Sequence, residues 1–152
     1  ILVPFVKRLR TERLRPRAGE VASAMIVGVG IDLCSVERMR RELDHSDGFE
    51  TSAFTLVEIA STRRHPHPDR RYAALFAAKE AVVKAMAGAP ATGMLWRDIE
   101  VGDGDGTAHV TLRGRALEAA SFLNIDHIHV SFTHTHERAM ACAFATSNPG
   151  AS

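Results

Sequence analysis

The chain has 152 residues, enough for one compact domain with a hydrophobic core and too few for two comfortable ones. Its 19 Lys and Arg nearly balance its 18 Asp and Glu, so the net charge of +1 gives no reason to expect nucleic acid. No apolar run approaches the roughly 20 residues that cross a bilayer, so no membrane is expected. Cys34 and Cys142 form no CxxC pair, which argues against a disulfide framework and favours a reducing, cytoplasmic compartment.

The first 24 residues differ in composition from the remainder of the chain. They are strongly basic, and Met25 follows them just before the first strand-like run. They lack the ordered charged, apolar and cleavage-site regions of a signal peptide. We therefore expect one domain over residues 25–148, preceded by a poorly ordered extension over residues 1–24 without a catalytic role. An expression remnant and a basic docking arm are the alternatives for this extension.

Capping and periodicity patterns predict the first elements of the domain. The apolar, β-branched run over residues 26–31 contains two glycines and predicts a buried strand. Ser35 is expected to cap a polar helix that runs to about Leu43. Thr55, with Glu58 three residues later, has the capping-box pattern of a second short helix.

An alanine-rich helix over residues 70–87 is the longest element expected. It follows a loop over residues 65–69, where two prolines disfavour helix, and Gly88 begins the segment that ends it. The remaining elements are strands over 98–101 and 109–112 around a glycine-rich turn, a helix over 114–123, and a hairpin of strands over 127–133 and 138–145. This alternation predicts an α+β fold, with helices packed on a mainly antiparallel sheet.

Asp32 follows the first predicted strand directly. A buried carboxylate without a partner is strongly disfavoured, so this side chain needs a cation or hydrogen-bond donors. It could accept N–H bonds from the turn that begins at Ser35, or it could bind a metal. Judged alone, capping is the slightly better explanation.

The central helix places charged side chains in apolar surroundings. Glu80 and Lys84 are four residues apart and share a helix face, as in an ordinary ion pair. The neighbouring residues are mostly Phe, Ala and Val, among which an acid and two lysines, Lys79 and Lys84, are unexpected. A carboxylate and a lysine aimed at one point suit a divalent cation and a phosphate.

A third group lies in the strand predicted over residues 127–133. His129, Ser131 and Thr133 alternate along the chain and therefore share one face of the strand. Imidazole and hydroxyl groups on one face can hydrogen-bond phosphate oxygens. Taken without Asp32 and without the charged residues of the central helix, this pattern would be better explained by cross-strand pairing of small polar residues.

Together these groups resemble the holo-acyl-carrier-protein synthase family of 4′-phosphopantetheinyl transferases. The family signatures stand here as G-I-D-L at 30–33 followed by Arg38, F-T-L-V-E at 54–58, F-A-A-K-E-A-V-V-K-A at 76–85, D-I-E at 98–100 and H-V-S-F-T-H at 129–134. The resemblance covers residues 25 to about 145 in the family order. It implies the single-repeat form of the 4′-phosphopantetheinyl transferase fold.

The resemblance also implies an activity: transfer of 4′-phosphopantetheine from coenzyme A to a serine of an apo acyl carrier protein, with Mg²⁺, releasing 3′,5′-ADP. Asp32 and Glu80 would bind the Mg²⁺, and Lys84 would neutralise the phosphate under attack. Glu80, His134 or a metal-bound water would take the serine proton, and the sequence does not choose among them. The residues implied to bind coenzyme A are Arg71, Lys79, Lys84, Gly88, Ser131, Thr133 and His134.

Members of this family are typically homotrimers with active sites between subunits, which places Asp32 and the Glu80 helix on opposite sides of a subunit boundary. Arg38 would face the acidic recognition helix of the carrier. One position departs from the family, because Leu75 stands where an arginine usually serves the 3′-phosphate of coenzyme A. Arg71, one helical turn earlier, is the expected replacement.

Two other functions are compatible with parts of the sequence. Leu75 is the one feature that favours a non-catalytic homologue that binds a carrier protein or coenzyme A. The H-x-H pairs at 65/67, 127/129 and 134/136 would suit a transition-metal protein, although a dedicated zinc site usually has a fuller ligand set.

Overall fold

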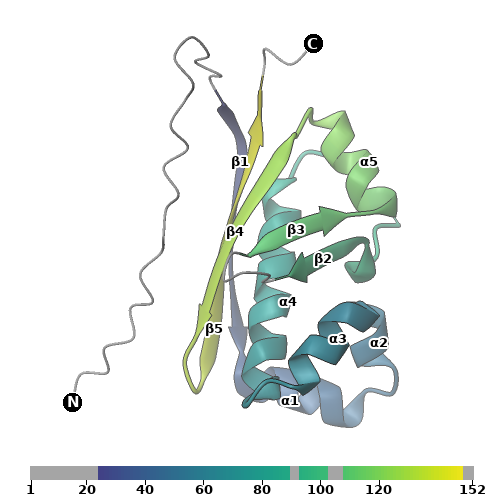
Figure 1. Ribbon diagram of the computed structural model, residues 1–152, viewed down its shortest axis with the longest axis vertical. Coiled ribbons are helices and arrows are strands. Elements are labelled where there is room, and N and C mark those ends of the chain that lie inside the picture. The colour runs from purple at the N-terminus through teal and green to yellow at the C-terminus, as the bar shows by residue number, and fades with distance from the viewer. Residues whose placement is uncertain (1–23, 90–92, 103–107, 149–152) are drawn as a thin grey trace, which may run out of the picture.

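The computed structural model describes residues 24–89, 93–102 and 108–148 (Figure 1). A long central helix, α4 (Pro68–Ala85), packs on one face of a three-stranded antiparallel sheet. The strand order is β1 (Met25–Ser35), β5 (Arg138–Ser147), β4 (His127–His134). The expected α+β fold is confirmed.

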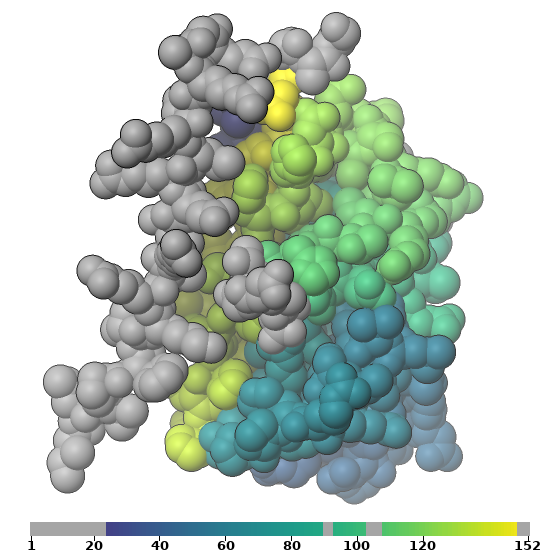
Figure 2. Space-filling model, viewed as in Figure 1, coloured from purple at the N-terminus to yellow at the C-terminus, as the bar shows by residue number. Residues whose placement is uncertain are grey.

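Smaller elements pack around the central helix. These are α1 (Val36–His45), α2 (Phe49–Ala53), α3 (Leu56–Arg63), η1 (Trp96–Asp98), β2 (Ile99–Gly102), β3 (His109–Leu112) and α5 (Gly114–Phe122). Strands β2 and β3 pair as a separate antiparallel ribbon. In the space-filling view α3, β3 and α5 form a continuous surface in front of the helix (Figure 2).

The element boundaries follow local chemistry. Ser35 caps α1 and accepts a hydrogen bond from the Arg38 N–H at 3.3 Å, and Thr55 and Glu58 form a complete capping box on α3, as predicted. Helix α4 begins at Pro68, two residues earlier than expected, because proline needs no N–H partner in the first helical turn. Of the predicted extension all but the last residue, and of the predicted glycine-rich turn over 102–106 all but Gly102, lie outside the described residues.

Two glycines bring β1 against α4. A Cβ atom added at Gly30 would lie 1.9 Å from the carbonyl oxygen of Ala81, and one at Gly28 would lie 2.0 Å from that of Ala85. Any larger side chain would therefore push the strand off the helix. Asp32 is the next inward-facing residue along this strand, so the same contact places its carboxylate beside the helix.

Alanine fills the interface between sheet and helix. The alanines here are at most 1% exposed and are Ala139, Ala141, Ala143 and Ala145 on β5 and Ala73, Ala74, Ala77, Ala78 and Ala81 on α4. The opposite face of the sheet carries large apolar side chains that are 39–66% exposed: Val27, Val29, Ile31, Leu33, Met140 and Phe144. We call this second set the outer sheet face. Within the described residues, no helix is both long and apolar enough for a membrane span.

Candidate active site

A cleft of about 580 Å³ opens where β1 ends, between α1 and the middle of α4. Two carboxylates line it, Asp32 from β1 and Glu80 from α4, together with the arginines Arg38 and Arg138. Its apolar lining includes Phe49 and Phe76, and Glu42 adds a third acid. The cleft therefore combines a negative centre with positive charge at its border.

Asp32 bonds across to α4 and does not cap the helix that follows it. Its Oδ1 accepts a hydrogen bond from the Lys84 Nζ at 2.7 Å, and the same ammonium donates to the Ile31 carbonyl oxygen at 3.0 Å. Ser35 provides the α1 cap instead. The hydrogen bond to Asp32 raises the pKa of Lys84, so this half-exposed side chain is fully charged at neutral pH.

Glu80 lies in surroundings that disfavour its charge. Burial, followed by the charge of Asp32, raises the pKa of Glu80, while Lys84 and Arg38 oppose the shift. A divalent cation between the two carboxylates would relieve this repulsion. Mg²⁺ is usually held by one or two carboxylates plus phosphates and waters, so the residues present fit that ion.

Cys34 also lines the cleft but is not a nucleophile. Burial and the charge of Asp32 raise the pKa of its thiol to about 11, so it stays protonated. The alternative of a transition-metal site finds no support in the described part of the chain, where no group of three or more His, Cys, Asp or Glu side chains could hold an ion. His127 and His129 approach each other, with ring centroids 6.4 Å apart, but only as a pair.

One expectation about the assembly is wrong. Asp32 and Glu80 do not lie on opposite sides of a subunit boundary, because both line one cleft of a single chain. The ion pair of Asp32 with Lys84, which lies on the same helix as Glu80, joins the two elements directly.

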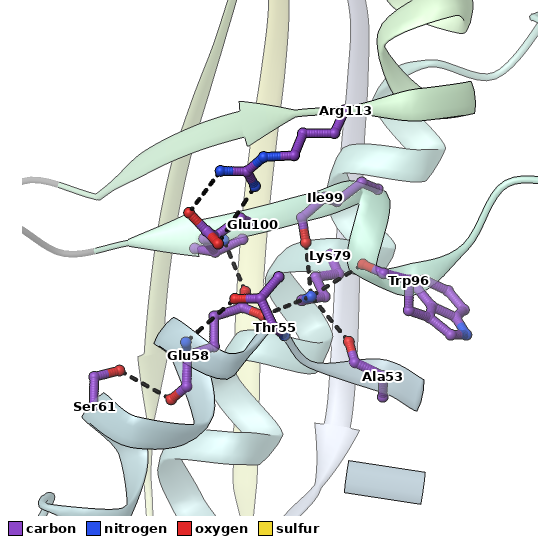
Figure 3. A network of polar contacts seen from close by, with 10 residues as sticks. Ala53, Thr55, Glu58, Ser61, Lys79, Trp96, Ile99, Glu100 and Arg113 are labelled. Atoms are coloured by element: carbon purple, nitrogen blue, oxygen red, sulfur yellow. Dashed lines mark hydrogen bonds and ion pairs between the residues drawn. The ribbon is translucent and has the colours of Figure 1, made fainter. Parts of the chain in front are cut away.

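The expectation that Lys79 binds coenzyme A is also wrong. Its side chain is fully buried on the far side of α4, where it pairs with Glu58 at 2.8 Å and donates to three backbone carbonyls (Figure 3). Consecutive residues on a helix point about 100° apart, so Lys79 and its neighbour Glu80 face different surroundings. The motif pattern contains both residues, but it does not show which one faces the cleft.

Leu75 and Arg71 face the interior of the protein. Leu75 is fully buried, so the family position does not present a side chain to solvent here. Arg71 is 8% exposed and its guanidinium lies 5.2 Å from the ring centroid of Phe132 on β4. Arg71 and Glu80 are nine positions apart, about 14 Å along the helix.

His134 lies in a basic cluster away from the cleft of its own chain. Its ring is 6.2 Å from that of His65, and Arg70 contacts His136 at 2.6 Å. Burial, followed by the charges of His65 and Arg70, lowers the pKa of His134. The register pairs His134 with Ala139 and Ala139 with Cys34, so two strand spacings, about 10 Å, separate His134 from the β1 backbone.

The prediction that His129, Ser131 and Thr133 share one strand face is confirmed. All three are exposed and lie on the same side of the sheet as the outer sheet face, away from α4. Gly88, also expected near coenzyme A, is exposed beyond the end of α4 with φ of 110°. The chain therefore brings Asp32, Glu80 and Arg38 together at the cleft, with Lys84 bonded to Asp32, and leaves the remaining expected residues elsewhere.

Sequence reasoning missed several cleft residues, among them Glu42, Phe49, Phe76 and Arg138. Phe76 opens the ten-residue signature, which could have singled it out. The other three carry no local signal, because α1, α2 and β5 meet only in the folded chain.

Comparison with known proteins places this geometry in a family. A model of the 4′-phosphopantetheinyl transferase superfamily matches residues 28–145. The holo-[acyl-carrier-protein] synthase of Alkaliphilus metalliredigens is 43% identical over 124 residues, which is 80% of this chain and 100% of the relative. The crystal structure of holo-ACP-synthase from Plasmodium yoelii has a TM-score of 0.71 at 26% identity, covering 82% of this chain and 97% of that one.

A holo-(acyl-carrier-protein) synthase from Bacillus anthracis, in complex with CoA (3′,5′-ADP), has a TM-score of 0.66 at 28% identity. The similarity covers 81% of this chain and 98% of the Bacillus anthracis chain. The chain therefore belongs to the 4′-phosphopantetheinyl transferase superfamily and, within it, to the holo-[acyl-carrier-protein] synthases, which are enzymes. The resemblance drawn from the sequence motifs is confirmed.

Proposed function

We propose that the protein transfers the 4′-phosphopantetheine group of coenzyme A to a serine of an apo acyl carrier protein, with Mg²⁺, and releases 3′,5′-ADP. The observation that carries this proposal is that Asp32 and Glu80 line one cleft while Lys84 bonds the Asp32 carboxylate. The names of the relatives and the CoA (3′,5′-ADP) complex of the Bacillus anthracis enzyme support the acceptor and the donor.

In this mechanism Asp32 and Glu80 would hold Mg²⁺, which when bound supplies positive charge to the pyrophosphate of coenzyme A. Lys84 is half exposed and can turn from Asp32 towards a phosphate oxygen. The carrier serine oxygen forms a bond to the β-phosphorus, the bond from that phosphorus to the bridging oxygen breaks, and 3′,5′-ADP leaves. Positioning and electrostatic stabilisation dominate such reactions.

The serine proton has three candidate acceptors: Glu80, His134 and a metal-bound water. Glu80 is suited by a raised pKa, which makes its carboxylate a better base than an ordinary glutamate. His134 is suited by a lowered pKa, which keeps its imidazole neutral at pH 7. Because His134 lies away from the cleft of its own chain, it would act at the cleft of a neighbouring chain.

A homotrimer with shared active sites is part of the proposal. The outer sheet face exposes six large apolar side chains, and contiguous apolar surface of this kind is typical of an interface. Ser131 and Thr133 lie on that same face, where a neighbouring chain could bring a bound phosphate to them. Gly88, at the open end of α4, would allow close approach of coenzyme A.

Positive charge supports the remaining contacts. Arg38 is exposed at the cleft and would meet the acidic helix of the carrier protein. Arg71, close to Arg70 and His134, would supply charge to the 3′-phosphate of coenzyme A. A cytoplasmic location agrees with Cys34 and Cys142, which are both free.

The test is mass spectrometry of an apo acyl carrier protein incubated with the protein, coenzyme A and Mg²⁺. We expect the carrier to gain one phosphopantetheine group, and to remain unmodified when Mg²⁺ is chelated or when Asp32→Asn replaces the wild type. Binding of coenzyme A by calorimetry without any carrier modification would instead identify the non-catalytic homologue.

A further inference from the structure

A buried ion pair lies directly behind the cleft. Lys79 is 0% and Glu58 is 1% exposed, and their charged groups are 2.8 Å apart (Figure 3). The Lys79 ammonium also donates to the carbonyl oxygens of Ala53, Trp96 and Ile99 at 2.9, 3.0 and 2.7 Å. We call Lys79, Glu58 and these three carbonyls the buried ion-pair cluster.

Glu58 completes the cluster on the other side. One of its carboxylate oxygens accepts from the Thr55 N–H at 2.8 Å and also meets Lys79, and the other accepts from the Val101 N–H at 2.8 Å. The cluster therefore ties five elements together: α2, α3, α4, η1 and β2. A methionine at position 79 could fill the same space but could not bond the three carbonyls.

The elements that the cluster anchors also carry the apolar wall of the cleft. Helix α2 ends at Ala53, a Lys79 partner, and begins at Phe49, which lines the cleft beside Phe76. The ring centroids of Phe49 and Phe76 are 6.1 Å apart, and those of Phe76 and Trp96 are 5.2 Å apart. Displacing α2 or η1 from α4 would therefore move this wall.

Stability alone does not account for such a pair. Two charges lose their hydration when buried, and replacing a buried pair by well-packed apolar residues is often neutral or stabilising. The cluster is instead suited to fixing one geometry, because it joins four backbone segments to one helix through directional bonds.

We propose that Lys79 and Glu58 are positioning residues, which hold α2 and η1 against α4 and thereby place the Phe49–Phe76 wall for coenzyme A. The inference rests on the proposed transfer function. Neither residue touches the reacting atoms. Their effect on turnover passes through the wall, while Asp32 and Glu80 keep their places on β1 and α4.

The test compares Lys79→Met, Glu58→Gln and the double variant with the control Ile59→Ala. Ile59 lies on α3, is 7% exposed and is apolar, so its truncation weakens the same region without removing a polar contact. Each protein is assayed for unfolding in urea, for transfer kinetics, and for emission of Trp96, the chain's one tryptophan.

We expect both single variants to be destabilised, because each leaves one buried charge unpaired, and the double variant to regain part of that stability. The double variant should still show a KM for coenzyme A raised on the order of ten-fold, with an unchanged Mg²⁺ requirement. Its Trp96 emission should shift. Ile59→Ala should lose stability but keep the wild-type KM and emission.

A folded double variant with wild-type KM and emission would overturn the proposal, as would an equal rise in KM in Ile59→Ala. Failure of the proposed function has a different signature, because wild-type protein would then modify no apo-carrier. In that case calorimetry measures the binding of coenzyme A to wild type, the double variant and Ile59→Ala. Weaker binding by the double variant alone supports the positioning role, and equal binding by all three proteins refutes it.

Discussion

Lys79 and Lys84 stand five residues apart on α4 and have opposite surroundings. Lys79 is enclosed by Glu58 and three carbonyl oxygens, whereas the side chain of Lys84 is 50% exposed and bonded to Asp32. Burial lowers the pKa of Lys79 against the opposing charge of Glu58, while the hydrogen bond to Asp32 raises that of Lys84. One sequence motif therefore contains both a buried lysine that links several elements, Lys79, and a half-exposed charged lysine, Lys84.

Substitution of Lys84 should separate chemistry from stability. We expect Lys84→Met to lower kcat/KM by about ten- to hundred-fold, the range for losing a charge-assisted contact to phosphate. Its urea midpoint should hardly change, because exposed ion pairs contribute little to stability. Steady-state transfer kinetics and urea unfolding of the same preparation check both parts. Near-normal turnover would contradict a role of Lys84 at the phosphate.

Arg71 permits a test with two ligands. If its charge serves the 3′-phosphate, Arg71→Met should weaken coenzyme A by about ten- to hundred-fold and barely affect dephospho-coenzyme A, which lacks that phosphate. Calorimetry measures both affinities. Arg70→Met is the matched comparison, one residue away in the same cluster. Equal losses for the two ligands would mean that Arg71 acts through its packing on Phe132.

The elements of the fold pack through close backbone contacts and a few hydrogen bonds and ion pairs. Gly30 is the clearest example, because an added Cβ would lie 1.9 Å from a backbone oxygen of α4. We expect Gly30→Ala to destabilise the protein by about 1–3 kcal/mol or more, as overpacking does. Urea unfolding measures the loss. Turnover of the remaining folded protein should also fall, because the displaced strand carries Asp32.

Helices α2, α3 and α4 are also tied together at Glu50, which accepts hydrogen bonds from Arg63 and Tyr72. Burial alone would raise the pKa of Glu50, but these bonds outweigh it and hold the pKa below the ordinary value of 4.5. The stabilisation is therefore present above that value and lost as the pH falls through the lower, folded-state pKa.

Glu50→Gln should reveal this pH dependence. The difference in unfolding free energy between wild type and variant should be largest near neutral pH and shrink as the pH falls below 4.5. Urea unfolding of both proteins over a pH series measures it. A difference that does not change with pH would show that the charge of Glu50 is not the source of its stabilisation.

At this scale much of the fold could be predicted from the sequence. Local signals are strong where a cap or period dominates, as at Ser35 and in the capping box of Thr55 and Glu58. They do not reveal that the cap residue Glu58 is also the counter-ion of Lys79, since that contact joins segments 21 residues apart in sequence. The cleft itself was only partly predictable. Asp32, Glu80 and Arg38 lie in recognisable motifs, whereas Glu42, Phe49 and Arg138 reach the cleft only through tertiary packing.

The whole molecule divides its proposed machinery between two regions. Asp32 and Glu80 line the cleft and Lys84 bonds Asp32, while His134 lies about two strands away in its own basic cluster. In the proposed homotrimer, a neighbouring chain would supply His134 to each cleft. The outer sheet face, with its exposed apolar side chains, offers a surface on which such chains could meet.

Mixed assemblies test this division. Light scattering should give a mass near three chains. If His134 is the base, mixing Asp32→Ala with His134→Ala subunits should restore part of the activity that each lacks alone, because some clefts would combine intact partners. A mixture of Asp32→Ala and Glu80→Ala should stay inactive, since both defects affect the same half of a site. Full activity in a monomer would contradict the shared site.

The alanine seam between β5 and α4 has a consequence for how the chain tolerates change. Alanine has no rotamers to lose, so this interface forms with little loss of side-chain entropy. It also leaves little spare volume, since these alanines are at most 1% exposed and protein interiors are close-packed. Tolerance of larger side chains along β5 should therefore alternate with a period of two. A larger residue should disrupt the interface at Ala139 and Ala141, which face α4, but not at Met140 between them, which faces outwards, unless another chain covers that face.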